Sequence, residues 1–487
     1  MKIALICRVF ENYAFEIFST ILKKKGHCVE LFYDHGLFDD YSITSKIPAK
    51  FLSENNKFIK DIVNYSPDYI LFSIFTDNLK WSLNLSEKLK KYIKNSKIIF
   101  GGPHITIIKD EIIKKFNFID YAVCGAGEHA INDIACNNLN ENTIGLIYRK
   151  NNKVISNNWN VIISQNYLNL IPDKTLFTNK MPFLKKYYST FSGFGCPFAC
   201  SFCIHSTLKK YKNYSYSKKN INSLIDELKI AKKNGCEKVI FHDDVFTINK
   251  IWLIEFLKKY KQIINLPFIC ISHPLFIDDE IAYNLKSSNC VNIEIGTQIM
   301  DNKLKKTMLN RNETNKQVMK SLLILKKHNI SVTIDHIFGI PEETIENHLK
   351  SLRLYKKANI SRVILSYLTA YPGISINKIL LNKNLISKKD LNKIKNGNVQ
   401  NFMNYGSLKV NKNIMKTEFL FEWLPFISIN LLNTIINKKL YKYLPVNKIL
   451  SKYIPFFLKT FSQNEFNLEI FIKRYLFFIK KRLGIKL

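Results

Sequence analysis

The chain has 487 residues, of which 46% are hydrophobic and 13% aromatic, so it can bury more than one core and is not a disordered protein. It carries 73 lysine and arginine residues against 39 acidic ones, a formal net charge of +34. Lysines are spread through every segment, however, and arginine, the usual reader of phosphates and bases, is scarce. Without a basic stripe, nucleic acid is not the expected partner.

The number of cysteines and the length of the apolar runs both help to predict the cellular compartment. Ten cysteines are too few for a disulfide scaffold in a chain of this length, and three of them fall within eight residues, as in metal sites. The opening run Ile3–Cys7 is too short for a signal peptide. The longest apolar candidate, 419–436, is broken by Glu422 and Pro425, so no membrane-spanning helix is predicted. We expect a cytoplasmic protein.

Residues 1–145 are predicted to form a first domain of the α/β class. Short apolar runs alternate there with helix-length amphipathic stretches, a pattern that predicts a doubly wound parallel sheet. Such sheets bind ligands in the crevice beyond the carboxyl ends of their strands. The predicted strands are Ile3–Cys7, Cys28–Tyr33, Tyr69–Ile74, Ile98–Phe100 and Tyr121–Cys124.

Two glycine-rich turns follow the fourth and fifth predicted strands. The first reads Gly101-Gly102-Pro103-His104 and the second Gly125-Ala126-Gly127-Glu128. Glycine lacks a Cβ, so these turns would let the backbone approach a bulky ligand closely. Each turn alone would equally suit an ordinary strand-to-helix connection.

Together and in this order, the turns resemble the cobalamin-binding domain that precedes the barrel in many radical S-adenosylmethionine (SAM) enzymes. That family often has Gly-Gly-Pro-His and then Gly-Glu-Gly-Glu, from which Ala126 departs. The family's Rossmann-like fold and cobalamin cofactor are implied here. The resemblance places cofactor contacts at Ser73, Gly101, Gly102, Pro103, His104, Gly125, Gly127 and Glu128.

This chain lacks the motif that supplies the lower axial ligand of the cobalt in one class of cobalamin enzymes. Cobalamin mutases supply a histidine from Asp-x-His-x-x-Gly, and Asp34-His35-Gly36 has the wrong spacing. Cobalamin is therefore expected without a histidine from that motif. His104 is expected to pack in its turn near the corrin rather than to bind cobalt.

A linker is predicted at 146–185, polar and rich in asparagine, and a dense cysteine motif follows it. Cys196, Cys200 and Cys203 lie in a Cys-x₃-Cys-x₂-Cys pattern. Thiolates select iron–sulfur clusters or zinc. Three of them can hold three corners of one cluster and leave the fourth iron open. A structural zinc site, with His205 as a fourth ligand, is the competing interpretation.

The flanks of this motif resemble those of radical SAM enzymes, with Gly-Cys-Pro at the first cysteine and the aromatic Phe202 before the last. The resemblance implies that the three cysteines hold a 4Fe–4S cluster and that SAM chelates the open iron through its amino and carboxylate groups. One electron, from a reductant such as flavodoxin or ferredoxin, would then release a 5′-deoxyadenosyl radical.

Residues 186–385 alternate strands and helices at the spacing of a parallel βα barrel. Four strand ends carry short motifs that resemble radical SAM barrels fused to cobalamin domains, and Ile374 departs from the threonine common after the last. Asp243, Glu294 and Gln298 are predicted SAM contacts, although an acidic residue at a strand end also caps helices. The motifs are His242-Asp243-Asp244, Glu294-Ile295-Gly296-Thr297-Gln298, Gly339-Ile340-Pro341-Glu342-Glu343-Thr344 and Tyr371-Pro372-Gly373.

Residues 386–487 are predicted to be helical and are rich in aromatic, aliphatic and lysine residues. Such helices can pack over the barrel mouth, which we favour, or make peripheral contact with an anionic membrane.

The leading functional hypothesis is a cobalamin-dependent radical SAM enzyme that transfers a methyl group to an unactivated carbon of a small-molecule, lipid or peptide substrate. A radical cyclase or rearrangement enzyme of the same architecture is an alternative. A basic RNA-binding or RNA-modifying protein is another, although no separate nucleic-acid module is visible. A cobalamin sensor without catalysis would not need the three cysteines. No residue here names the substrate.

Overall fold

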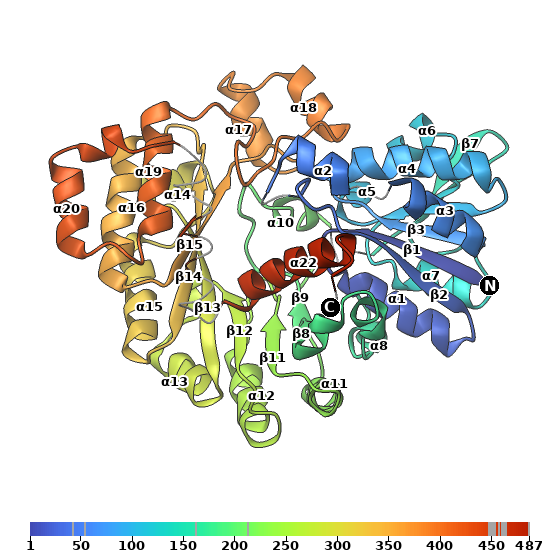
Figure 1. Ribbon diagram of the computed structural model, residues 1–487, viewed down its shortest axis with the longest axis horizontal. Coiled ribbons are helices and arrows are strands. Elements are labelled where there is room, and N and C mark those ends of the chain that lie inside the picture. Colours follow the sequence, from blue (N-terminus) through green and yellow to red (C-terminus); the bar gives the residue numbers. More distant parts are fainter. Residues whose placement is uncertain are drawn as a thin grey trace.

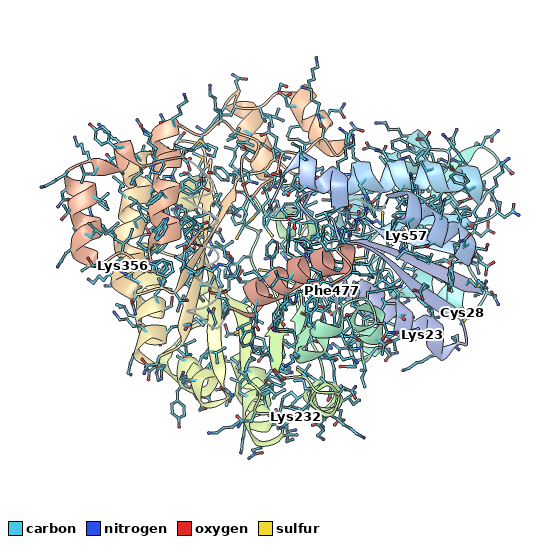
Figure 2. The ribbon with its side chains drawn as sticks, in the orientation of Figure 1. Lys23, Cys28, Lys57, Lys232, Lys356 and Phe477 are labelled. Atoms are coloured by element: carbon cyan, nitrogen blue, oxygen red, sulfur yellow. The ribbon has the colours of Figure 1, made fainter. Side chains whose placement is uncertain are left out.

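The computed structural model describes residues 1–485 except 41–42, 53–54, 161–162, 212–213, 447–453, 456–457 and 459–464. Two α/β units lie side by side, and one C-terminal helix runs between them (Figure 1). Lysines labelled in Figure 2 project from separate elements around the periphery, as expected for a charge that is spread over the whole chain.

The first unit has a sheet in the order β2-β1-β3-β4-β5-β6-β7. β1 to β5 pair in parallel, and all five predicted strands are confirmed. Its strands are β1 Lys2–Arg8, β2 Cys28–Asp34, β3 Tyr69–Ser73, β4 Lys97–Gly101, β5 Tyr121–Val123, β6 Leu146–Lys150 and β7 Lys153–Ser156. Its helices are α1 Tyr13–Lys24, α2 Lys46–Leu52, α3 Asn55–Tyr65, α4 Leu79–Tyr92, α5 Pro103–Ile108, α6 Glu111–Lys115 and α7 Glu128–Ala135.

Helices cover both faces of this sheet, so the doubly wound architecture is confirmed. α1 and α7 pack on one face around Phe15 and Ile131. α3 to α6 pack on the other around Leu89 and Ile105. The strands alternate between the two cores because successive side chains point to opposite faces.

The segment after residue 145 differs from the expected linker. β6 and β7 form an antiparallel hairpin that extends the first sheet, with β6 paired to β5. Asn151 and Asn152 form its turn with φ of 50° and 59°, left-handed values that asparagine tolerates well. The polar, asparagine-rich composition therefore marked a hairpin turn and not the start of a free linker. The connection continues through α8 Gln165–Leu168, α9 Thr175–Thr178 and the 3-10 helix η1 Pro182–Lys186.

The second unit is a six-stranded parallel sheet in the order β15-β14-β13-β12-β11-β8, curved as a partial βα barrel, as predicted. β8 and β15 are its edges, so it is open on one side. Its strands are β8 Tyr187–Thr190, β11 Lys238–Phe241, β12 Phe268–Ser272, β13 Cys290–Gln298, β14 Ser331–Phe338 and β15 Arg362–Tyr367, and a hairpin of β9 Gly193–Phe194 with β10 Ser217–Lys218 lies nearby. Its helices are α10 His205–Leu208, α11 Ile221–Lys233, α12 Lys250–Ile263, η2 Pro274–Phe276, α13 Asp279–Ser287, α14 Asn302–Thr307, α15 Asn315–Lys327, α16 Ile345–Ala358 and α17 Ile376–Asn382.

The C-terminal region is helical where the structure describes it. α19 and α20 pack beside α16, whereas α22 passes between the two units (Figure 1). The elements are α18 Lys388–Lys395, α19 Lys412–Trp423, α20 Ile429–Asn437, η3 Leu440–Tyr443 and α22 Phe466–Arg482. Within the described ranges, we find no helix with the length and hydropathy needed to cross a bilayer.

Candidate active site

The three motif cysteines lie in the loop after β9, at the carboxyl end of the first barrel strand. Burial raises the pKa of Cys196 to about 11 and that of Cys203 to about 12. The neighbouring Cys200 also raises the pKa of both Cys196 and Cys203, because all three lie in the same loop. Gly195 begins the loop with φ of +93°, and a Cβ there would lie 2.7 Å from the Ser215 carbonyl oxygen, so only glycine fits.

Hydrogen bonds from distant segments fix the loop. The Tyr214 hydroxyl accepts a hydrogen bond from the Cys196 amide at 2.8 Å. The Ser201 amide donates to the Leu309 carbonyl at 2.9 Å, and the Ile376 amide donates to the Ser201 carbonyl at 2.9 Å. The barrel loops thus hold the cysteines in place without any bound group.

Arg311 brings a positive charge to this loop. Its Nη1 lies 3.9 Å from the Sγ of Cys200, while Glu313 at 2.6 Å and the Gly296 carbonyl at 2.7 Å hold the guanidinium. A cation beside a thiolate suits a cluster whose ligands are all anionic. Sequence reasoning missed Arg311 because 111 residues separate it from Cys200 and no motif marks it.

The zinc interpretation fails on His205. Its Nδ1 contacts the Tyr214 hydroxyl, and its Nε2 lies 3.1 Å from Asp244, so neither ring nitrogen is free to be a fourth ligand. Three thiols with an arginine beside them therefore fit an iron–sulfur cluster.

A cavity of about 330 Å³ lies at the carboxyl edge of the first sheet. Seven of the eight predicted cobalamin contacts line it, together with Thr106, Phe18 and the α10 residues Ile204 and Leu208. α10 follows the cluster cysteines directly, so the cluster loop forms one wall of this cavity. The seven are Ser73, Gly101, Gly102, Pro103, Gly125, Gly127 and Glu128.

The glycines serve packing within the protein more than close approach to a ligand. A Cβ on Gly102 would lie 2.8 Å from the Ile74 amide nitrogen, and one on Gly125 would lie 2.1 Å from the Asn160 carbonyl oxygen. Both have positive φ, 99° and 73°. They let the turns fold tightly under the cavity, which is a different physical role from the one expected.

His104 is the one predicted cobalamin contact that does not line this cavity, and its contact with the cofactor stays a prediction. It is 1% exposed, its Nδ1 bonds to the Thr76 hydroxyl at 2.9 Å, and burial lowers its pKa to about 4. Glu128 does line the cavity: its Oε2 is buried and has no hydrogen-bond partner among the described residues, and burial raises its pKa. An orphaned carboxyl group suits a ligand rich in amides, such as cobalamin.

A larger cavity of about 1110 Å³ lies between the two units along the open side of the barrel. It shares Ser73, Gly102, Pro103, Glu128 and Leu208 with the first cavity, so the two adjoin. Near the cluster loop it is lined by Gly195, His205, Tyr214 and Asp244, and elsewhere by β15 and α22. The two cavities therefore adjoin, and residues that flank the cluster cysteines, such as Gly195 and His205, line the larger one.

None of the three predicted SAM contacts lines either of these two cavities. Asp243 is 2% exposed, and its oxygens accept hydrogen bonds from the Ser192 amide and from Lys218, both at 2.8 Å. Its carboxylate is used within the protein, and Asp244 faces the cavity in its place. Neighbouring residues point apart at this strand end, which the motif alone could not resolve.

Glu294 and Gln298 lie on the face of β13 that points into the barrel. Burial and the neighbouring Asp335 raise the pKa of Glu294, and burial also raises the pKa of Asp335. Gln298 is 7% exposed at an irregularity in the β13–β14 register. The sequence did not predict Asp335 as a carboxyl neighbour of Glu294, because Asp335 belongs to no recognised motif.

Comparisons with known proteins agree with this geometry. The family model for the B12 binding domain matches residues 10–135, and that for the radical SAM superfamily matches residues 191–355. An uncharacterized methyltransferase of Pyrococcus horikoshii is 24% identical over 342 residues, which cover 67% of this chain and 72% of the relative. The anaerobic magnesium-protoporphyrin IX monomethyl ester cyclase of Cereibacter sphaeroides is 22% identical over 331 residues, covering 62% of this chain and about half, 51%, of the relative.

Among solved structures, the cobalamin-dependent SAM radical enzyme OxsB, with aqua-cobalamin and SAM bound, superposes with a TM-score of 0.67. The match covers 99% of this chain and 80% of OxsB at 13% identity, which shows a shared fold. The two matched domains occur here in the same order, and the cysteine loop lies at their junction. The chain therefore carries a B12 binding domain followed by a radical SAM domain, and a 4Fe–4S cluster, SAM and cobalamin are the cofactors consistent with these two domains.

Proposed function

We propose that the protein is a radical SAM methyltransferase that acts on an unactivated carbon of a small molecule. The observation that carries this proposal is that the cavity beside the cluster loop adjoins the predicted cobalamin crevice, with Leu208 in the walls of both cavities. Methyl transfer requires that the substrate carbon react first with the radical and then with the methyl donor. A substrate bound between the two cavities could react with both without leaving its site.

When bound, SAM and cobalamin would supply the 5′-deoxyadenosyl radical and the methyl group. The protein's own residues hold and shield them. Cys196, Cys200 and Cys203 would ligate the cluster, with Arg311 beside Cys200. Glu128, whose raised pKa favours a protonated carboxyl, would hydrogen-bond to the periphery of cobalamin. Apolar walls that exclude water would protect the radical from quenching.

SAM contacts remain proposals for Asp243, Glu294 and Gln298, and we add Asp244 because it lines the larger cavity. Glu294 with its raised pKa would share a hydrogen bond with a neutral hydroxyl group more readily than with an ammonium. Asp244 already has His205 as a partner, so the two would act together at the cavity wall. A reductant of the flavodoxin or ferredoxin class and a cytoplasmic location also stay predictions.

The experiment that tests the proposal measures the products of SAM. With the substrate, a one-electron reductant and labelled methyl-SAM, a methyltransferase gives 5′-deoxyadenosine and S-adenosylhomocysteine in comparable amounts, and the label enters the product. Deoxyadenosine without homocysteine formation or methyl label would replace methyl transfer with a cyclase or rearrangement.

A further inference from the structure

The helix α22 lies outside both matched domains and is anchored at its two ends. At its start, Glu465 accepts hydrogen bonds from Asn292 at 3.1 Å and from Arg362 at 3.0 Å, within the amino-terminal end of the barrel. At its other end, Tyr475 and Phe478 belong to the core of the first unit. The labelled Phe477 in Figure 2 lies on this bridging segment. The middle of the helix therefore spans the space between the units.

One face of this middle segment lines the large cavity. Asn467, Ile470, Phe471 and Arg474 all contribute to its wall. They stand at positions i, i+3, i+4 and i+7, which lie on one side of an α-helix. α22 thus presents a mixed apolar and basic surface to the place where a substrate must lie between cluster and cobalamin.

Arg474 has a donor that the protein does not use. It is 4% exposed; Nη2 pairs with Asp40 at 2.5 Å and Nη1 donates to the Val9 carbonyl at 2.6 Å. Its Nε is buried with no hydrogen-bond partner in the described part of the chain. A buried N–H group without an acceptor is costly, so a ligand that supplies one would bind with advantage.

Arginine is concentrated around this cavity. Only seven of the 73 basic residues are arginines, yet the cavity wall holds three of these, Arg8, Arg362 and Arg474, and a single lysine, Lys174. Each of these arginines has a carboxylate partner, Asp34 for Arg8, Glu465 for Arg362 and Asp40 for Arg474, and Lys174 pairs with Glu11 at 3.0 Å. Arginine is the residue suited to oxyanions in partly buried sites.

We propose that α22 is the substrate-recognition helix and that the substrate is a largely apolar molecule with a carboxylate group, which accepts a hydrogen bond from Arg474 Nε. This inference rests on the proposed function in placing the substrate in this cavity. Ile470 and Phe471 contact the apolar part, and Arg362, paired with Glu465, lies at the barrel end of the cavity.

The test measures binding of three probes of matched size to the anaerobic holoenzyme by calorimetry: 4-phenylbutyrate, 4-phenylbutan-1-ol and 4-phenylbutylamine. We expect the carboxylate to bind at least tenfold more tightly than the other two. Arg474→Lys keeps a cation for Asp40 but removes the Nε–H group. It should weaken the binding of 4-phenylbutyrate at least tenfold. Arg353→Lys, on α16 beside Asn437, is the matched control and should change nothing. Equal binding of the three probes, or no effect of Arg474→Lys, would overturn the proposal.

A second variant covers the case in which Arg474→Lys does not fold. Ile470→Trp leaves the ion pair with Asp40 in place and should block 4-phenylbutyrate by filling the cavity; unchanged binding refutes the proposal. If Arg474→Lys instead lowers cobalamin retained after gel filtration, the acceptor belongs to the cofactor and the proposal is wrong. The binding assay needs no turnover. A preference for the carboxylate can therefore hold even if the enzyme does not transfer methyl groups, and methyl transfer can hold even if the preference is absent.

Discussion

Arg311 lies outside the cysteine motif, but its charge is expected to act directly on the cluster. Its positive charge beside Cys200 favours the more negative, reduced state of the bound cluster. Arg311→Gln should therefore lower the midpoint potential of the cluster while iron content stays close to wild type, as followed by electron paramagnetic resonance in a redox titration.

The double variant Arg311→Gln with Glu313→Gln is the control for charge. It removes one positive and one negative charge together and avoids a buried unpaired carboxylate, whose cost is about 3–5 kcal/mol. Its potential should lie nearer to wild type than that of the single variant. A potential that is identical in all three proteins would show that Arg311 only holds the loop.

His104 allows a prediction about pH at the same scale. Burial lowers its pKa to about 4 from 6.5, so it stays neutral in the folded protein while the unfolded chain takes up a proton below pH 6.5. That uptake favours unfolding, and stability falls from pH 6.5 toward 4, by at most about 3 kcal/mol from this group.

His104→Gln should flatten this part of the pH–stability curve and leave the cobalamin spectrum base-off, because His104 lies outside the cavity lining. Thermal unfolding from pH 4 to 7.5 and the visible spectrum of the bound cofactor check the two statements. A spectral change in the variant would mean that His104 reaches the cobalt after all.

At the scale of the element, α22 joins the barrel to the first unit through one buried anchor. Glu465 faces Arg362 in the barrel, both largely buried. Glu465→Ala leaves that guanidinium buried without its carboxylate and should lower the free energy of unfolding by about 3–5 kcal/mol. Denaturant unfolding measures it. Glu255→Ala, at an exposed position on α12, should change stability by no more than about 0.5 kcal/mol; an equal loss in both variants would refute the anchor.

At the scale of the whole molecule, the first unit depends on segments that lie far from it in sequence. Its core includes Phe177, Tyr475 and Phe478, and the β6–β7 hairpin completes its sheet. The fragment 1–145 ends before this hairpin, and it also lacks Asn160, whose carbonyl accepts a hydrogen bond from the Ala126 amide.

We therefore expect fragment 1–160 to retain more cobalamin on gel filtration than fragment 1–145, and both to retain less than the full chain. The cavity wall that α10 supplies is missing from each fragment. Equal retention by all three would show that the first unit binds the cofactor without help from the barrel.

The sequence by itself determined the two α/β units, their strands and the cysteine cluster motif. These depend on local periodicity, on turn residues and on ligands within eight positions, all of which can be read along the chain. Seven of the eight residues that it predicted as cobalamin contacts line the smaller cavity, because the carboxyl ends of parallel strands meet at one edge.

Only the tertiary structure decided which residues from distant parts of the chain contact one another. Arg311 meets Cys200 across 111 residues and Arg474 meets Asp40 across 434. Asp243 turns inward to Lys218 while its neighbour Asp244 faces the cavity. Such pairings depend on how separate elements pack, since the direction of a side chain at a strand end is set by the groups that surround it and not by its motif.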